Sequence, residues 1–117
     1  MAKILIIDDS ALSRRLLKNI LENLNHQVIE AADGLSGIEI FSIENPDCVF
    51  LDLTMPGMYG IDVLKSILDI NKDSKIIIAS ADIQKTTKEL SEITGARAFI
   101  NKPFVAEEIE KNIKEIL

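Results

Sequence analysis

Residues 48–57, Cys-Val-Phe-Leu-Asp-Leu-Thr-Met-Pro-Gly, hold the pattern that decides the fold: four apolar residues in a row that end at Asp52. An apolar run this short and continuous is typical of a strand that helices cover on both faces of a parallel sheet. Such sheets bind ligands beyond the carboxyl ends of their strands, so Asp52 lies where a functional residue is expected. An aspartate that only forms the turn before Pro56 and Gly57 would give the same local pattern.

Similar apolar runs occur along the chain, and helical patterns separate them. The five predicted strands are 4–7, 28–31, 48–51, 76–79 and 98–100. Apolar residues at helical spacing predict five helices, carried by Leu12, Leu16, Leu17, Ile20, Leu21 and Leu24; by Leu35, Ile38 and Phe41; by Ile61, Leu64, Ile67 and Leu68; by Ile83, Leu90 and Ile93; and by Val105, Ile109, Ile113 and Ile116. Ser10 is placed to cap the first helix, and Gly95 to end the fourth. This alternation predicts an α/β fold with a doubly wound parallel sheet and helices on both faces.

Length and composition predict one acidic, cytosolic domain that covers residues 1–117. Of the 117 residues, 47% are hydrophobic, which is enough for a core, and the net charge of −6 argues against direct binding to nucleic acid. The single cysteine, Cys48, excludes an intrachain disulfide and is expected to be buried in a reducing compartment. No apolar stretch has the length of a signal peptide or a transmembrane helix.

Reactive side chains follow four of the five predicted strands. Asp8 and Asp9 follow the first strand, Asp52 the third, Ser80 the fourth and Lys102 the fifth. A parallel sheet brings these strand ends to one edge, so the five side chains are expected in one crevice. Each has a plainer interpretation alone: an aspartate pair at a helix N-terminus, a turn aspartate, a strand-end hydroxyl and a surface lysine.

The charges of this group predict a metal site with phosphoryl chemistry. Carboxylates side by side repel one another, and a divalent cation such as Mg²⁺, which prefers oxygen ligands, removes that repulsion. Mg²⁺, Lys102 and the Ser80 hydroxyl together offer the cations and the donor that phosphoryl oxygens need. A carboxylate is also a competent nucleophile, and its product is an aspartyl phosphate.

Four motifs carry a family resemblance: residues 6–10 (IIDDS), 49–60 (VFLDLTMPGMYG), 76–82 (IIIASAD) and 100–104 (INKPF). In order and spacing they resemble response-regulator receiver domains of two-component signalling, across the chain from Lys3 to the last helix. The resemblance implies a flavodoxin-like (βα)5 fold with sheet order 2-1-3-4-5. It further implies that Asp52 is the phospho-acceptor, that Asp9, Asp52 and the carbonyl of Thr54 bind Mg²⁺ directly, that Asp8 binds it through water, and that Ser80 and Lys102 hold the phosphoryl oxygens.

The same resemblance implies a switch and its partners. Phe99 would be the aromatic switch residue, Thr54 and Asp82 would tune the lifetime of the phosphoryl group, and the Lys102–Pro103 bond would be cis. A sensor histidine kinase would donate the phosphoryl group, and a downstream protein would bind the changed surface of the fourth helix, fifth strand and fifth helix. A phosphatase is a further partner that the family allows. The chain is expected to be a monomer with an optional phosphorylation-linked dimer, and not to insert into membranes.

Two alternatives remain open from the sequence. The chain is either a complete chemotaxis-type regulator, as its start at Met1 favours, or the receiver part of a larger regulator with a DNA-binding or enzymatic output. An enzyme of the haloacid-dehalogenase phosphatase type is less favoured, because Asp52-Leu53-Thr54 lacks the second aspartate that such enzymes carry.

Five residues have simple expected roles. Arg14 and Arg15 in the first helix form either a solvated face or a docking site for an acidic partner. His26 is interpreted as a solvated surface residue in a polar turn, and Gly60, like Gly57, is assigned to the turn after Asp52 without chemistry.

Overall fold

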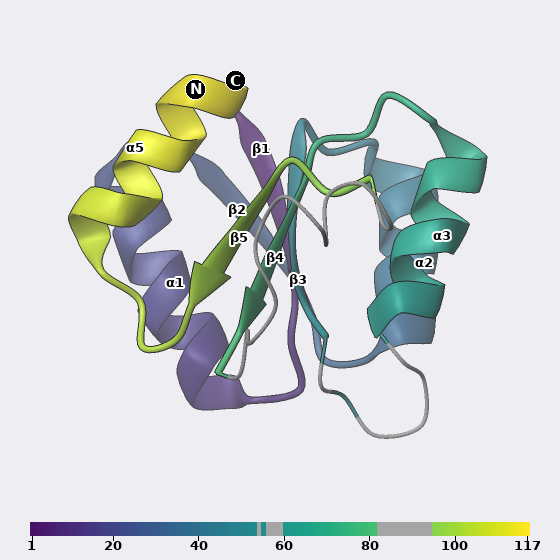
Figure 1. Cartoon of the computed structure of the whole chain (residues 1–117), viewed down its shortest axis with the longest axis horizontal. Coiled ribbons are helices and arrows are strands. Elements are labelled where there is room, and N and C mark those ends of the chain that lie inside the picture. The colour runs from purple at the N-terminus through teal and green to yellow at the C-terminus, as the bar shows by residue number, and fades with distance from the viewer. Residues whose placement is uncertain (54, 56–59, 82–94) are drawn as a thin grey trace.

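Five parallel strands form the central sheet of the computed structural model, which describes residues 1–53, 55, 60–81 and 95–117 (Figure 1). The strand order is β2-β1-β3-β4-β5, which confirms the predicted doubly wound topology. The strands are β1 (Lys3–Ile7), β2 (Gln27–Ala31), β3 (Cys48–Asp52), β4 (Ile76–Ser80) and β5 (Ala98–Asn101). Each strand contains its predicted run and extends it by one residue.

The described helices cover both faces of this sheet. Helices α1 (Ala11–Asn23) and α5 (Ala106–Ile116) lie on one face, and α2 (Gly34–Glu44) and α3 (Gly60–Ile70) lie on the other (Figure 1). These four helices confirm the first, second, third and fifth predicted ones. The fourth, expected around Ile83, Leu90 and Ile93, lies outside the described residues. None of the helices that the structure describes is long and apolar enough to cross a membrane.

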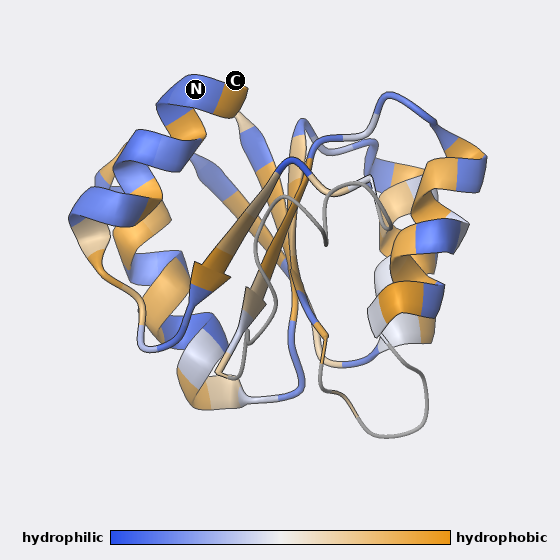
Figure 2. Cartoon of the chain, viewed as in Figure 1, coloured by the Kyte–Doolittle hydropathy of each residue, from blue (hydrophilic) through white to orange (hydrophobic). Residues whose placement is uncertain are grey.

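Strand β1 shows why the strand runs are continuously apolar. Ile4 and Ile6 belong to the core that α1 and α5 cover, while Leu5 and Ile7 belong to the core under α2 and α3. Successive side chains of a strand point to opposite faces, so a strand covered on both sides needs an apolar residue at every position. Figure 2 shows this hydrophobic sheet between helices that carry their hydrophilic residues outward. The end of β1 is therefore held from both faces.

Helix α1 begins where the sequence predicts, and only some of its leucines pack against the sheet. The Ser10 hydroxyl accepts a hydrogen bond from the Ser13 amide, which confirms Ser10 as the N-cap. Leu17 and Leu21 are buried, whereas Leu12 is 63% and Leu16 46% exposed. The predicted leucine stripe is therefore wider than the contact with the sheet, and its first two residues remain at the surface beside the carboxyl ends of the strands.

His26 differs from the prediction of a solvated surface residue. Its imidazole is partly buried, and Nδ1 accepts a hydrogen bond of 3.0 Å from the Ala2 backbone amide. This bond ties the turn after α1 to the residue that precedes β1. The pKa of His26 lies below its usual value because burial disfavours the charged ring and, secondarily, because the N-terminal ammonium repels it.

Acidification is expected to destabilise the fold in part through His26. Since the folded pKa is lowered, the unfolded chain takes up the proton first, so the stabilisation is complete above about pH 6.5 and is lost as the pH falls below it. Thermal unfolding of the wild type should therefore show a lower midpoint at acidic pH. His26→Gln keeps an acceptor for the Ala2 amide without the titration, and its midpoint should fall less over the same range. Equal pH dependence of the two proteins would contradict this role.

Candidate functional site

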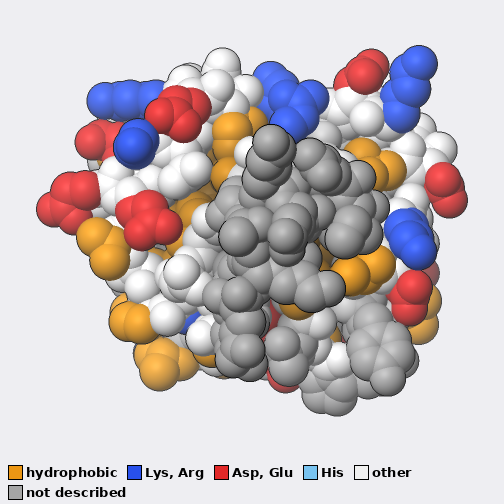
Figure 3. Space-filling view, in the orientation of Figure 1, with side chains coloured by type: hydrophobic (Ala, Val, Ile, Leu, Met, Phe, Trp, Pro, Cys, Tyr) orange, Lys and Arg blue, Asp and Glu red, His pale blue; other side chains and the backbone are white. Residues whose placement is uncertain are grey.

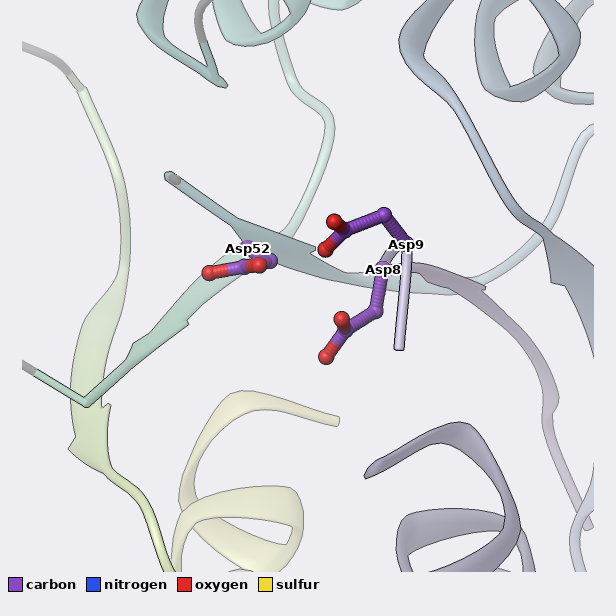
Figure 4. Close-up of side chains that lie close together, drawn as sticks. All are labelled: Asp8, Asp9 and Asp52. Atoms are coloured by element: carbon purple, nitrogen blue, oxygen red, sulfur yellow. The ribbon is translucent and has the colours of Figure 1, made fainter. Parts of the chain in front are cut away.

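Three aspartates meet at the carboxyl edge of the sheet. Asp8 and Asp9 follow β1, Asp52 ends β3, and the pairing of Ile7 with Leu51 sets these strand ends side by side. Asp8, Asp9 and Asp52 each offer an oxygen within 4.8 Å of the others. Figure 4 shows the carboxylates of Asp8 and Asp9 reaching out from the end of β1 on the side where Asp52 lies. The structure thus brings together the three carboxylates that the sequence singled out.

Lys102 supplies a positive charge to this cluster from the end of β5. Its Nζ lies 2.7 Å from Asp8 Oδ2 and 3.7 Å from Asp52 Oδ2, and its side chain is only 16% exposed. A partly buried lysine between two buried carboxylates offsets the charge that burial would otherwise penalise. The Lys102–Pro103 peptide bond is cis, as predicted.

Of the four other residues predicted for the site, the structure describes Ser80 and Phe99. Ser80 is buried at the end of β4, and its backbone carbonyl accepts a hydrogen bond of 3.0 Å from the Lys102 amide. Phe99 in β5 is partly buried and packs against the core on the α2 and α3 side of the sheet. Thr54 and Asp82, predicted to tune the phosphoryl lifetime, lie outside the described residues.

Asp8 is held by its neighbours through both its side chain and its backbone. Its Oδ1 accepts a hydrogen bond from the Ser10 amide, and its Oδ2 accepts one from Lys102. Its backbone amide donates to the Ala31 carbonyl at the end of β2, and its backbone carbonyl accepts from Arg14 at 2.7 Å. Asp9, in contrast, is exposed. The cluster therefore combines a fixed carboxylate with one that faces solvent.

The donor set fits a hard divalent cation. Among the residues that the structure describes, the candidate ligands are carboxylate oxygens, the type of ligand that Mg²⁺ and Ca²⁺ take. Oxygens that share an octahedral Mg²⁺ lie about 3 to 4 Å apart. The carboxylate oxygens of the cluster lie within 4.8 Å of one another, so small side-chain rotations would bring them to that spacing. Both oxygens of Asp8 already accept protein hydrogen bonds, whereas Asp9 is exposed to solvent.

Gly60 is a site residue that sequence reasoning left without a role. It begins α3, and a Cβ on it would lie 2.5 Å from Leu53 Cα and 2.7 Å from the Asp52 carbonyl oxygen. Its amide also donates a hydrogen bond of 3.2 Å to the Leu53 carbonyl. The helix therefore packs directly on the backbone of the Asp52–Leu53 peptide, a contact that only the folded structure reveals.

Gly60→Ala is expected to destabilise the fold by about 1–3 kcal/mol, because the added methyl group must displace backbone. The displaced backbone carries Asp52, so metal binding at the cluster should weaken as well. Gly37→Ala is a comparison in which the added Cβ would meet the Ile7 side chain instead of backbone. Chemical denaturation and Mg²⁺ titration of both variants test the difference. Wild-type stability and binding in the Gly60→Ala protein would contradict the close packing described here.

Comparison with known proteins agrees with this arrangement. The family model described as "Response regulator receiver domain" matches residues 4–114. The chain belongs to the response-regulator receiver family. Among curated proteins, this receiver domain is 36% identical to the chemotaxis protein CheY of Thermotoga maritima, covering 97% of this chain and 96% of the relative. It is 38% identical to the sporulation initiation phosphotransferase F of Bacillus subtilis, covering 98% and 93%.

A solved structure extends the comparison to the fold. The response regulator TrrA of Thermotoga maritima, determined in complex with Mg²⁺ and beryllofluoride, is 32% identical, covers all of both chains and superposes with a TM-score of 0.89. This receiver domain therefore belongs to a family of phospho-acceptor signalling switches, and its acidic cluster lies at the carboxyl edge of the same fold.

Proposed function

We propose that this receiver domain takes a phosphoryl group onto Asp52 from the phosphohistidine of a sensor histidine kinase, with Mg²⁺ as cofactor. The observation that carries the proposal is the single cluster in which Asp8, Asp9 and Asp52 lie within 4.8 Å of one another and Lys102 contacts two of them. The relative with bound Mg²⁺ and beryllofluoride supports the same chemistry.

In the proposed transfer, a carboxylate oxygen of Asp52 attacks phosphorus while the phosphorus–nitrogen bond of the donor breaks and the imidazole leaves with the electron pair. Mg²⁺ held by the aspartate cluster would supply positive charge to the phosphoryl oxygens. Lys102, which lies 3.7 Å from Asp52, and the hydroxyl of Ser80 at the end of β4 bind these oxygens as the charge develops. The backbone pairing around β3 and β4 keeps these groups in place before the donor arrives.

The metal ligands are assigned from the resemblance to receiver domains. Asp9 and Asp52 would hold Mg²⁺ directly, together with the carbonyl of Thr54, which lies outside the described residues. Asp8 acts through a metal-bound water, in keeping with the two hydrogen bonds that its oxygens already accept. Mg²⁺ keeps several waters in most protein sites, so such an indirect ligand is chemically ordinary.

A surface beside the site suits a protein donor. Leu12, Leu16, Pro103 and Phe104 line a hollow of about 320 Å³ next to Lys102, and Leu12 and Leu16 are exposed. Figure 3 shows hydrophobic side chains over the start of α1 and the segment before α5, at the lower left. A donor that covers this apolar surface would bring its phosphohistidine to Asp52. Small acyl phosphates need no such surface, so they should phosphorylate the protein without it.

The conformational change that follows phosphorylation is proposed to reach the surface at β5 and its neighbouring elements. Phe99 is partly buried in β5, which pairs with β4 so that Ser80 lies opposite Asn101. Phosphorylation of Asp52 adds negative charge and acceptor oxygens at the end of β3, beside the end of β4, which favours movement of Ser80 toward them and of Phe99 behind it. A downstream protein then binds the changed surface of β5 and α5, together with the fourth helix that the sequence predicts, which lies outside the described residues. Thr54 and Asp82 are proposed to set how long the phosphoryl group lasts.

The function is thus a switch and not turnover of a foreign substrate. A phosphatase of the haloacid-dehalogenase type would place a second aspartate two residues after the nucleophile, where this chain has Thr54. Whether the domain acts alone or within a larger regulator changes the output and leaves the chemistry of the site unaltered.

Incubation with a small acyl phosphate and Mg²⁺ tests the proposal. The intact mass should increase by one phosphoryl group, and a chelator should prevent the increase. Hydrolysis of a generic phosphate ester by the unmodified protein would instead support the phosphatase interpretation. Failure of any labelling at saturating donor would contradict the phospho-acceptor role.

A further inference from the structure

Arg14 connects the acidic site to the edge of the sheet. Its Nη1 donates a hydrogen bond of 2.7 Å to the backbone carbonyl of Asp8, and its Nε donates one of 3.2 Å to Glu30 Oε1 in β2. Its side chain is only 18% exposed. This arginine is therefore engaged within the chain, which corrects the expectation that Arg14 forms a solvated face or a docking site; Arg15, beside it, is exposed.

The carbonyl that Arg14 holds belongs to the peptide that joins Asp8 to Asp9. Rotation of that peptide would move the start of the Asp9 side chain relative to Asp8. On its other side, Asp8 is fixed by the hydrogen bond that its backbone amide donates to the Ala31 carbonyl. Arg14 thus restrains the part of the chain from which the exposed carboxylate of the cluster emerges.

Glu30 fixes Arg14 in turn. Its two carboxylate oxygens lie 3.2 Å from Arg14 Nε and 3.6 Å from Lys18 Nζ, so α1 is clamped to β2 next to the site. The planar guanidinium has donors in a fixed arrangement, which lets one side chain hold a carbonyl and a carboxylate together. A lysine has one nitrogen and would not span both partners in this way.

We propose that Arg14 is a positioning residue for the cation site, with Glu30 as its anchor. The inference rests on the proposed Mg²⁺ site and adds to it residues that do not touch the metal. Groups that orient metal ligands typically contribute about 10- to 100-fold to metal affinity. Arg14 acts through the backbone of Asp8, so Arg14→Met should weaken Mg²⁺ binding by about 10-fold, the lower end of that range.

The sign of this effect separates positioning from charge. Removal of a positive charge near three carboxylates would by itself tighten Mg²⁺ binding. Arg15→Met is the matched control. It removes the same charge at the next position, where the side chain is exposed. Its Mg²⁺ affinity should stay within about twofold of the wild type or increase slightly, because exposed charges are screened.

The experiment compares Mg²⁺ affinity by calorimetry in the wild type, Arg14→Met, Arg14→Lys, Glu30→Gln and Arg15→Met. Thermal unfolding without metal is measured in parallel, together with amide hydrogen exchange at Ser10, whose amide donates to Asp8 Oδ1. We expect weaker binding and faster Ser10 exchange in Arg14→Met and Glu30→Gln, with Arg14→Lys intermediate. Arg14→Lys, which keeps the positive charge, also keeps the test decisive if Arg14→Met does not fold.

Wild-type or tighter binding in the folded Arg14 and Glu30 variants would overturn the inference, even if their unfolding midpoints fell. Equal loss in Arg15→Met would overturn it as well, since the effect would then not depend on the contacts that Arg14 makes. If the wild type itself binds no Mg²⁺, the proposed metal site fails first and the positioning role falls with it.

Discussion

Replacing Lys102 by methionine should slow phosphorylation by a small acyl phosphate about 100-fold or more, the usual cost of removing a donor that meets developing charge. Lys102 reaches Asp8 at 2.7 Å and Asp52 at 3.7 Å, so its ammonium lies where oxygens of an incoming phosphoryl group must go. Mg²⁺ binding should remain at least as tight as in the wild type, because the lysine no longer neutralises Asp8. The rate of mass increase and a calorimetric titration measure the two effects separately.

Lys65→Met is the matched control, since Lys65 is an exposed lysine of α3. The Lys65→Met protein should be phosphorylated by the acyl phosphate at the wild-type rate. A Lys102 variant that is phosphorylated as fast as the control would show that the lysine does not act on the phosphoryl group. Loss of Mg²⁺ binding in that variant would instead assign Lys102 to the structure of the metal site.

Replacing Asp9 by asparagine should weaken Mg²⁺ binding by about 100-fold, at least as much as the loss of an outer group that orients a metal ligand. Asparagine keeps the size of the side chain and removes the negative charge that a divalent cation needs. Because Asp9 is exposed, the fold should tolerate the change, and the unfolding midpoint without metal should stay the same or rise. Phosphorylation should then require much higher Mg²⁺ concentrations.

Asp69→Asn makes the same change in charge at an exposed position near the end of α3, and its affinity for Mg²⁺ should equal that of the wild type. Similar losses in both variants would mean that only net charge matters. Wild-type binding by Asp9→Asn would remove Asp9 from the metal site.

Much of the fold could be predicted because its strands are buried on both faces. Residues 48–51 and 76–79 are apolar at every position, and both occur in strands of the sheet as expected. The N-cap of α1 was predicted as well, because Ser10 precedes the first helical leucine. The exposure of Leu12 and Leu16 could not be predicted, since helical spacing alone does not say how much of a wide apolar stripe the sheet covers.

The candidate site was predictable for a related reason. The side chains that follow parallel strands gather at one edge, so Asp8, Asp9, Asp52 and Lys102 were expected to meet, and they do. Arg14 and Gly60 were missed because their roles depend on contacts between elements. The approach of α1 to Glu30 in β2, and of α3 to the Asp52 backbone, follows from packing angles that no local pattern records. His26 was misjudged similarly, because its partner is the Ala2 amide at the start of β1.

Localising the phosphoryl group within the chain tests the central claim most directly. After treatment with an acyl phosphate and Mg²⁺, borohydride reduces the acyl phosphate carbon to an alcohol, and mass spectrometry of the peptides finds the reduced residue. The account predicts one reduced residue, at position 52, and no labelling of Asp52→Asn, whose amide is a poor nucleophile. Reduction at Asp8 or Asp9, or labelling of the Asp52→Asn protein at the wild-type rate, would contradict it.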